Sequence, residues 1–298
     1  MTIPAMPLLI GGMPKPPVDA DGADGTVLTF PETAIGTVML TKQGEFADIR
    51  AAAGEVHVAS GWTVQLNLPD AVSDGAVLAA QPPNGVHILI AAGLDDDALD
   101  GLADYRVLTY LRLGARVTPA GVAKLAHLSS LTMLSIASEH VDDAAVEQLA
   151  GLPELLSIHL DPCAVTDAGA AALTRLPKVT SISITSDRLT DAAAQVLAES
   201  PTLQNLTLHG SALTNEAIRA LSTSTSLESV TLTGGFDDAG LLELVNGYPA
   251  LQNARIDGPA VTDAGVMAAF AVGITAQLNG QWFSPKAAER LRQRQVSG

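Results

Sequence analysis

Aliphatic residues recur along most of the chain in a fixed frame, L-x-x-L-x-L. The frame is clear at Leu108, Leu111 and Leu113; the next copy starts 23 residues later, and five more follow at steps of 24 residues. The copies start at Leu108, Leu131, Leu155, Val179, Leu203, Leu227 and Leu251. The alternation of apolar and polar positions that ends each frame predicts a short strand. Seven strands at a nearly constant interval predict a repeat protein.

A second pattern follows each frame, as in "VTDAGAAAL" from Val165 and "LTDAAAQVL" from Leu189. Its apolar spacing predicts a helix of about two to three turns. The residue that precedes each helix can cap its free N–H groups; these residues are Asp142, Thr166, Thr190, Thr214, Asp237 and Thr262. An aspartate usually follows, and we expect it to interact with the positive end of its own helix dipole; these are Asp143, Asp167, Asp191, Asp238 and Asp263.

A unit of one strand and one helix cannot bury its apolar side alone, so the units are expected to stack. The strands then form a parallel sheet on one side of a curved solenoid, and the helices cover the other side. The frame, spacing and copy number resemble leucine-rich repeats with helical outer faces, as in ribonuclease-inhibitor-like proteins and especially bacterial proteins whose units carry "TDAG". The resemblance implies an α/β, right-handed solenoid with a concave parallel sheet and convex helices.

The repeat family usually has an inward asparagine or cysteine after the frame. Here Cys163 stands at that place, but Glu139, Asp187 and Ser211 do so in other units. A continuous ladder of buried asparagines is therefore not expected, and the turns after the strands should be more exposed.

The pattern divides the chain into five segments. Residues 63–106 contain degenerate repeats, with Leu66 and Leu68 and then Ile88 and Ile90 as the inward residues, and a last strand is expected in "TAQLNG" from Thr275. The expected segments are a Pro/Gly-rich flexible tail at 1–24, a β-rich N-terminal cap at 25–62, degenerate repeats at 63–106, regular repeats at 107–283 and a C-terminal capping helix at 284–298.

Charge and composition narrow the class of partner. Sixteen Lys and Arg residues against 32 Asp and Glu residues give a formal net charge of −16, which argues against nucleic acid as a partner. The single cysteine, Cys163, cannot form an internal disulfide, and no apolar run reaches the length of a membrane span. We therefore expect a cytoplasmic protein with no membrane association.

Little in the sequence points to catalysis. The row of aspartates could suggest a metal site, but the copies lie one repeat apart and each is explained by a helix N-terminus. Cys163 fits a thiol within the repeat frame better than a nucleophile. The sequence contains no nucleotide-binding loop or serine-hydrolase motif. No catalytic residue, cofactor or metal is predicted.

The outward positions of the predicted strands offer the best candidate site. Most are small and neutral, but larger side chains of types common at interfaces gather in the N-terminal half: Tyr110, Arg112, Met133, Leu156 and His159. The predicted function is non-catalytic binding of another protein on the concave sheet. Two alternatives stay open: an adaptor or effector that recruits a substrate to a separate enzyme, and an enzyme with its site in the irregular region 25–106.

Overall fold

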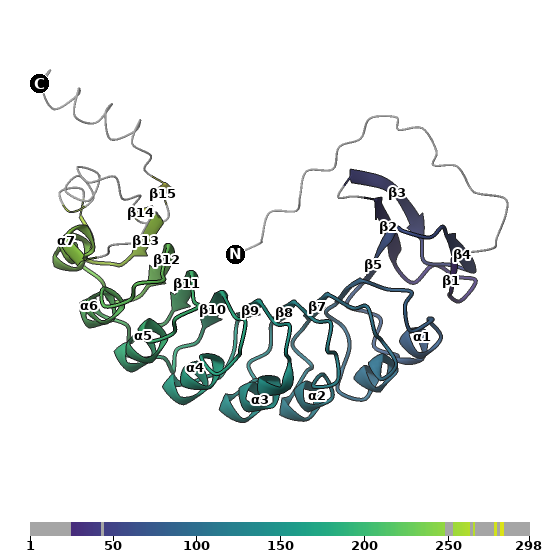
Figure 1. Cartoon of the computed structure of the whole chain (residues 1–298), viewed down its shortest axis with the longest axis horizontal. Coiled ribbons are helices and arrows are strands. Elements are labelled where there is room, and N and C mark those ends of the chain that lie inside the picture. The colour runs from purple at the N-terminus through teal and green to yellow at the C-terminus, as the bar shows by residue number, and fades with distance from the viewer. Residues whose placement is uncertain are drawn as a thin grey trace, which may run out of the picture.

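The computed structural model describes residues 25–42, 45–247, 253–262, 265, 277–278 and 281–282. Within them, eleven strands form one sheet in the order β13-β12-β11-β10-β9-β8-β7-β6-β5-β2-β3. From β5 to β13, each strand is parallel to the next, and these strands line the inner side of an arc (Figure 1). They are β5 (Thr63–Leu68), β6 (Ile88–Ala91), β7 (Tyr110–Leu113), β8 (Met133–Ile136), β9 (Ser157–Leu160), β10 (Ser181–Thr185), β11 (Asn205–His209), β12 (Ser229–Thr233) and β13 (Asn253–Asp257).

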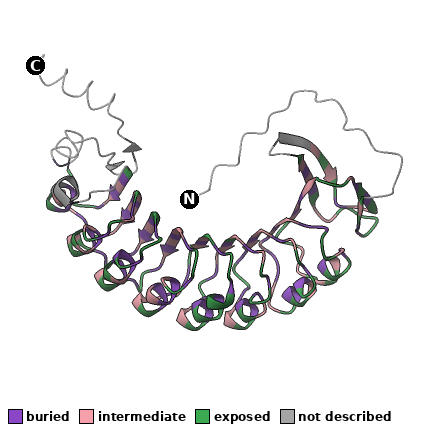
Figure 2. Cartoon of the chain, in the orientation of Figure 1, coloured by how far each residue is buried: buried purple, intermediate pink, exposed green. Residues whose placement is uncertain are grey.

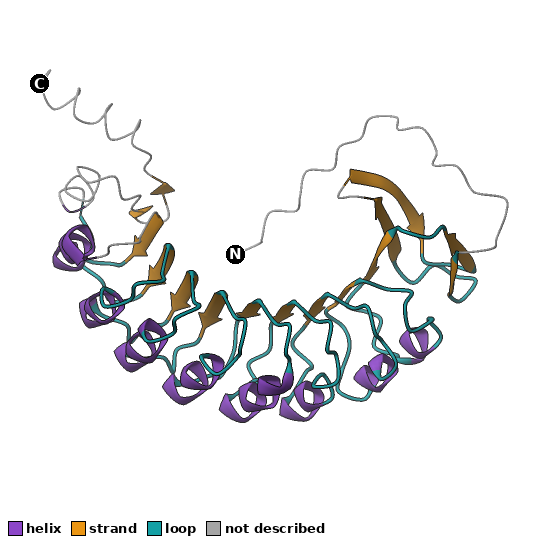
Figure 3. Ribbon diagram, in the orientation of Figure 1, coloured by secondary structure: helices purple, strands orange, loops and turns teal. Residues whose placement is uncertain are grey.

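Helices cover the outer, convex side of the arc (Figure 3). They are α1 (Ala76–Ala79), the 3-10 helix η1 (Ala98–Leu102), α2 (Pro119–Ala123), α3 (Asp143–Gln148), the 3-10 helix η2 (Leu149–Gly151), α4 (Asp167–Leu173), α5 (Asp191–Ala198), α6 (Asn215–Leu221) and α7 (Asp238–Gly247). Several are shorter than the predicted two to three turns, because the chain must turn back within one repeat. After α4, for example, the N–H of Leu176 donates to the carbonyl of Leu173 and the Leu176 side chain is buried.

The frame residues form the core between the sheet and the helices. All those from Leu108 to Leu232 are buried (Figure 2). Leu134, Ile158, Ile182 and Leu206 stand opposite one another on adjacent strands, so equivalent residues of successive repeats stack in one row. The predicted α/β leucine-rich-repeat solenoid is therefore confirmed; its expected C-terminal helix at 284–298 and the tail at 1–24 lie outside the described residues.

The residues before the repeats form two pairs of antiparallel strands. β2 (Thr37–Lys42) pairs with β5 and with β3 (Glu45–Ala51), and so extends the large sheet. β1 (Thr26–Thr29) pairs with β4 (Glu55–Val58) in a separate two-stranded sheet. The segment of β3, "EFADIRA", alternates only weakly between polar and apolar residues, so its sequence gives little indication of a strand.

The strand expected from Thr275 pairs differently from the prediction. In the described part of this region, β14 (Gln277–Leu278) pairs antiparallel with β15 (Gln281–Trp282) instead of joining β13 as a further parallel strand. Only Asn279 and Gly280 separate the two strands in the sequence, and such a short connection favours antiparallel pairing over pairing with the preceding repeat.

Neighbouring repeats are joined by hydrogen bonds that threonine donates to aspartate. The predicted N-caps at Asp142, Thr166, Thr190 and Thr214 are confirmed, since each side chain accepts from an N–H of the first helical turn. The following aspartate does more than interact with its own helix: Asp167 Oδ1 accepts from the N–H of Thr190 at 2.9 Å, and Asp167 Oδ2 accepts from the Thr190 hydroxyl at 2.6 Å.

The same Asp–Thr pair recurs along the convex side. It joins Asp96 to Thr118, Asp143 to Thr166, Asp167 to Thr190, Asp191 to Thr214, and Asp238 to Thr262. Asp143, Asp167 and Asp191 lie in the first turn of their own helices, as expected, and their bonds to the next repeat were not predicted. In α3, α4 and α5 the carboxylate projects from the first helical residue toward the next repeat, where it accepts from the residue that caps the next helix.

One junction uses a different pair. Asp237 caps α7, and the preceding repeat offers Asn215 in place of aspartate. The Asn215 amide donates to Asp237 Oδ1 at 2.6 Å, and the Asp237 N–H donates to Asn215 Oδ1 at 3.3 Å. The hydrogen bonds from Asn215 and from the N–H of Gly240 hold the pKa of Asp237 below its usual value. An amide at this position avoids placing two carboxylates against each other.

The turns after the strands were predicted to be exposed, and Glu139 and Asp187 are exposed there. The residues before them, Ser138 and Ser186, are buried, which was not predicted. The Ser138 hydroxyl donates to the carbonyl of Val117 at 2.6 Å, and the Ser186 hydroxyl donates in the same way one repeat back. Serine thus satisfies backbone carbonyls where the family pattern has asparagine.

Candidate functional site: the concave face of the sheet

The inner face of the arc consists of aligned rows of side chains, one from each strand. Along each strand, buried residues alternate with residues that face the concave side. The parallel register places Tyr110, Met133 and Ser157 side by side in one row, and Arg112, Ser135 and His159 in the next. From β10 to β12 the same rows contain mostly serine and threonine. The face is therefore apolar and bulky at one end and small and polar toward the other.

All five predicted site residues lie on three neighbouring strands, or at their start. Tyr110 and Met133 are directly opposite each other on β7 and β8. Leu156 stands at the entry to β9, where its N–H donates to the carbonyl of Thr132. Met133 is 47% exposed and Leu156 is 42% exposed, although both are large and apolar. Exposed apolar side chains that are adjacent mark candidate contact surfaces.

Two residues of this surface were missed by the sequence reasoning. Ile88 and Ile90 were expected to be inward, but the buried residues of β6 are Leu89 and Ala91. The register places Ile88 beside Tyr110 and Ile90 beside Arg112. The prediction slipped by one residue because "ILIA" offers apolar side chains to both faces of the strand, and such a slip exchanges the two faces.

These residues define an apolar patch, which consists of Ile88, Ile90, Tyr110, Met133 and Leu156. Arg112 and His159 lie along one side of it. Burial lowers the pKa of His159, and the positive charge of Arg112 acts in the same direction, whereas Asp161 opposes the shift; His159 Nε2 lies 3.8 Å from Asp161 Oδ2. At neutral pH, Arg112 is therefore the cation beside the patch.

The candidates for metal and thiol chemistry have structural partners. Within the described residues, no group of three or more His, Cys, Asp or Glu side chains is placed to hold a metal ion. The aspartates lie in a row and bind the next repeat instead of converging. Burial raises the pKa of the Cys163 thiol to about 11, and its Sγ lies 3.5 Å from the carbonyl of Thr185. At neutral pH the thiol is protonated, which does not suit a nucleophile.

In the irregular region 25–106, the histidine with a shifted pKa, His87, forms a hydrogen bond with the backbone. Burial lowers the pKa of His87, and its Nδ1 accepts from the N–H of Val64 at 3.2 Å. Burial also raises the pKa of Tyr105, whose hydroxyl donates to the carbonyl of Leu78. Both side chains thus tie one repeat to another. Among the described helices, none is long and apolar enough to cross a membrane.

No protein-family model and no curated protein matches the chain. The solved structures to which the chain is similar include the following three. An internalin (inlF) from Listeria monocytogenes is 19% identical, with a TM-score of 0.49 over 73% of this chain and 67% of that one. The yeast Rad7 and Elc1 complex is 19% identical (TM-score 0.41; 60% and 57%), and the TLR13–ssRNA13 complex is 15% identical (TM-score 0.43; 72% and 35%).

The chain thus spans 57% and 35% of the matched chains in the Rad7 and TLR13 structures. These distant similarities add no residue to the concave site. The chain's own repeated frame, its aligned buried rows and its inner parallel sheet show the fold to be a leucine-rich-repeat solenoid.

Proposed function

We propose that this chain is a non-catalytic binding module that holds another protein on its concave sheet. The observation that supports the proposal most is the apolar patch, where Met133 and Leu156 stay exposed beside Tyr110 and two isoleucines. Aromatic, methionine and arginine side chains are enriched at protein interfaces. Burying such side chains would give a partner its main binding free energy, and Arg112 would select an acidic neighbour.

The proposal extends to the type of partner and its location. The net charge of −16 disfavours nucleic acid, so the partner we propose is a protein. The free, buried Cys163 suits a reducing compartment, which supports a cytoplasmic location. We also place the chain among bacterial leucine-rich-repeat proteins, because its "TDAG" units resemble theirs. In one of these units, the N–H of Gly169 donates to Asp143 Oδ1 of the preceding repeat.

The experiment compares proteins retained from the native cell by three immobilised forms of the chain: wild type, Tyr110→Ala/Arg112→Ala, and a convex-side control, Arg175→Ala/Lys178→Ala. We expect the first double variant to lose the partner that wild type and control retain, at an unchanged melting temperature. Equal retention by all three forms would contradict the proposed site. Retention lost together with a fall in melting temperature is resolved with Met133→Ser, which changes a 47% exposed side chain and should lose the partner without unfolding.

A further inference from the structure

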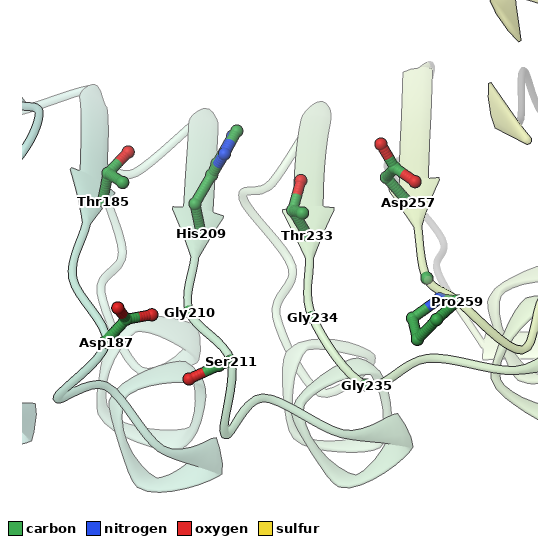
Figure 4. Close-up of a pocket in the computed structure, with 11 residues that line it drawn as sticks. Thr185, Asp187, His209, Gly210, Ser211, Thr233, Gly234, Gly235, Asp257 and Pro259 are labelled. Carbon is green, nitrogen blue, oxygen red and sulfur yellow. The ribbon is translucent and has the colours of Figure 1, made fainter. Parts of the chain in front are cut away.

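A shallow hollow of about 570 Å³ lies where β10 to β13 end, away from the apolar patch (Figure 4). Its upper wall is a row of last strand residues that the register places side by side: Thr185, His209, Thr233 and Asp257. Its lower wall consists of the turns that follow the strands, with Asp187, Ser211, Pro259 and the glycines 210, 234, 235 and 258.

Glycines keep the floor of the hollow free of side chains. A Cβ atom added to Gly258 would lie 2.4 Å from the carbonyl oxygen of Phe236, and one added to Gly234 would lie 2.8 Å from that of Leu213. Any larger residue would have to shift the backbone of the preceding turn. In earlier repeats, Ser138 and Ser186 stand at the equivalent place and bond inward.

The lining offers hydrogen-bond acceptors but few donors. Three backbone N–H groups of the turns donate to backbone carbonyls: that of Gly210 to Thr233, that of Gly234 to Asp257, and that of Gly235 to Leu213. These amides are therefore already used and cannot bind an anion. Among the described residues that line the hollow, none is lysine or arginine, whereas two are aspartates. Among the described residues, the Asp187 side chain has no hydrogen bond or ion pair that would compete with a ligand.

The one histidine in the wall does not neutralise these carboxylates. Burial lowers the pKa of His209, with Arg255 and His159 acting in the same direction, while Asp161 and Asp257 oppose the shift. The neutral ring can still accept a hydrogen bond at one nitrogen. The hollow is therefore anionic at neutral pH, with acceptor atoms on both walls.

We propose that this hollow binds a basic segment of a polypeptide, with lysine or arginine side chains that donate to Asp187 and Asp257. The proposal deepens the proposed function and rests on it in one respect, since the segment would belong to the partner held by the apolar patch. Asp187 follows β10 and Asp257 ends β13, so three strand spacings separate them, or roughly 14 Å. One cation cannot contact both, whereas two cations four residues apart on an extended segment can.

The test uses the full chain labelled with ¹⁵N and the peptide acetyl-Gly-Arg-Gly-Gly-Gly-Arg-Gly-amide. We expect saturable shifts at the backbone amides of Gly210, Gly234, Gly235 and Gly258. The same peptide with citrulline in place of arginine keeps the size and loses the charge, and it should bind at least fivefold more weakly. Equal binding of the two peptides, or shifts that spread over the molecule without these glycines, would overturn the proposal.

The peptide could be attracted to any acidic part of the protein, so the test needs a control variant with the same change in net charge. Asp187→Asn/Asp257→Asn should weaken the arginine peptide at least fivefold. Asp70→Asn/Glu199→Gln removes the same charge from exposed positions outside the hollow and should change the affinity less than twofold. Equal weakening in both variants would show non-specific attraction and overturn the proposal.

The two proposals fail separately. Tyr110→Ala/Arg112→Ala lies outside the hollow and should bind the arginine peptide like wild type. If that variant loses no cellular partner while the peptide still binds in the hollow, the proposed function fails and the hollow stands as a site for basic segments. If the patch variant loses the partner but the peptide does not bind wild type, the hollow proposal alone fails.

Discussion

Exchanging one Asp–Thr pair for the Asn–Asp pair tests whether these side chains join the repeats. In Thr190→Asp, a second carboxylate would replace the hydroxyl that donates to Asp167 Oδ2 at 2.6 Å. Two unit charges about 4 Å apart repel by about 1 kcal/mol in water and about 4 kcal/mol at an effective dielectric constant near 20. Because Thr190 is exposed, we expect the lower part of this range, plus about 1 kcal/mol for the lost hydrogen bond. The total loss should be about 2 kcal/mol in the free energy of unfolding.

Adding Asp167→Asn should restore most of that loss. The double variant reproduces the arrangement at Asn215 and Asp237, where amide and carboxylate are 2.6 Å apart. Asp167→Asn alone should cost about 0.5–1 kcal/mol, because the asparagine still accepts from the Thr190 N–H. A double-mutant cycle followed by urea denaturation and circular dichroism should therefore give a favourable coupling of about 1.5–2 kcal/mol.

The neighbouring aspartate provides the matched control. Asp143 binds Thr166 and not Thr190, so Asp143→Asn should not rescue Thr190→Asp. One molar salt should weaken the effect of Thr190→Asp, since screening reduces repulsion between exposed charges. A coupling below 0.5 kcal/mol, or equal rescue by Asp143→Asn, would refute the view that each carboxylate binds specifically to the capping residue of the next repeat.

Three further predictions concern the core, the glycine of "TDAG" and pH. Ile182→Ala should cost about 2–5 kcal/mol of unfolding free energy, because Ile182 is fully packed in the central row, and a loss under 1 kcal/mol in urea denaturation would contradict that packing. Gly169→Ala should lower the melting temperature, because its Cβ would meet Asp143 Oδ1 at 2.4 Å, and combining it with Asp143→Ala should cost less than the sum of the two changes. For His159, burial lowers the folded-state pKa below the ordinary 6.5, so the unfolded chain binds the proton more readily. The free energy of unfolding should therefore fall as pH drops below 6.5, and His159→Gln should show a smaller fall between pH 7.5 and 5.5.

Much of the fold could be predicted because spacing alone identifies the inward residues. Each Leu, Ile or Val of the frame recurs one repeat later at a position that a parallel sheet aligns, as for Ile158 and Ile182. The capping threonines were predictable for the same reason. Where two adjacent positions are both plausible, spacing fails: "ILIA" has apolar side chains on both faces, and both Ser138 and Glu139 can follow a strand.

The bonds between repeats and the hollow could not be predicted from a pattern read along one chain. The sequence shows that Asp167 recurs, but the direction of its carboxylate depends on how closely the next helix packs. The hollow depends on the alignment of Asp257 with Thr233 and His209, residues that lie 24 positions apart and carry no shared motif. For the patch, composition revealed Tyr110 and Met133, whereas Ile88 required the register of β6.

The pairing of Asn215 with Asp237 makes the array selective about which unit can follow which. Deleting residues 179–202 would place Asp167 next to Thr214. This is again an Asp–Thr pair, so hydrogen bonds should join the two repeats. Deleting residues 203–226 removes a stretch of the same length but would place Asp191 next to Asp237. These two carboxylates would repel each other instead of forming a hydrogen bond. An engineered array that shortens or transplants these repeats must therefore pair aspartate with threonine, or asparagine with aspartate, at every junction between repeats.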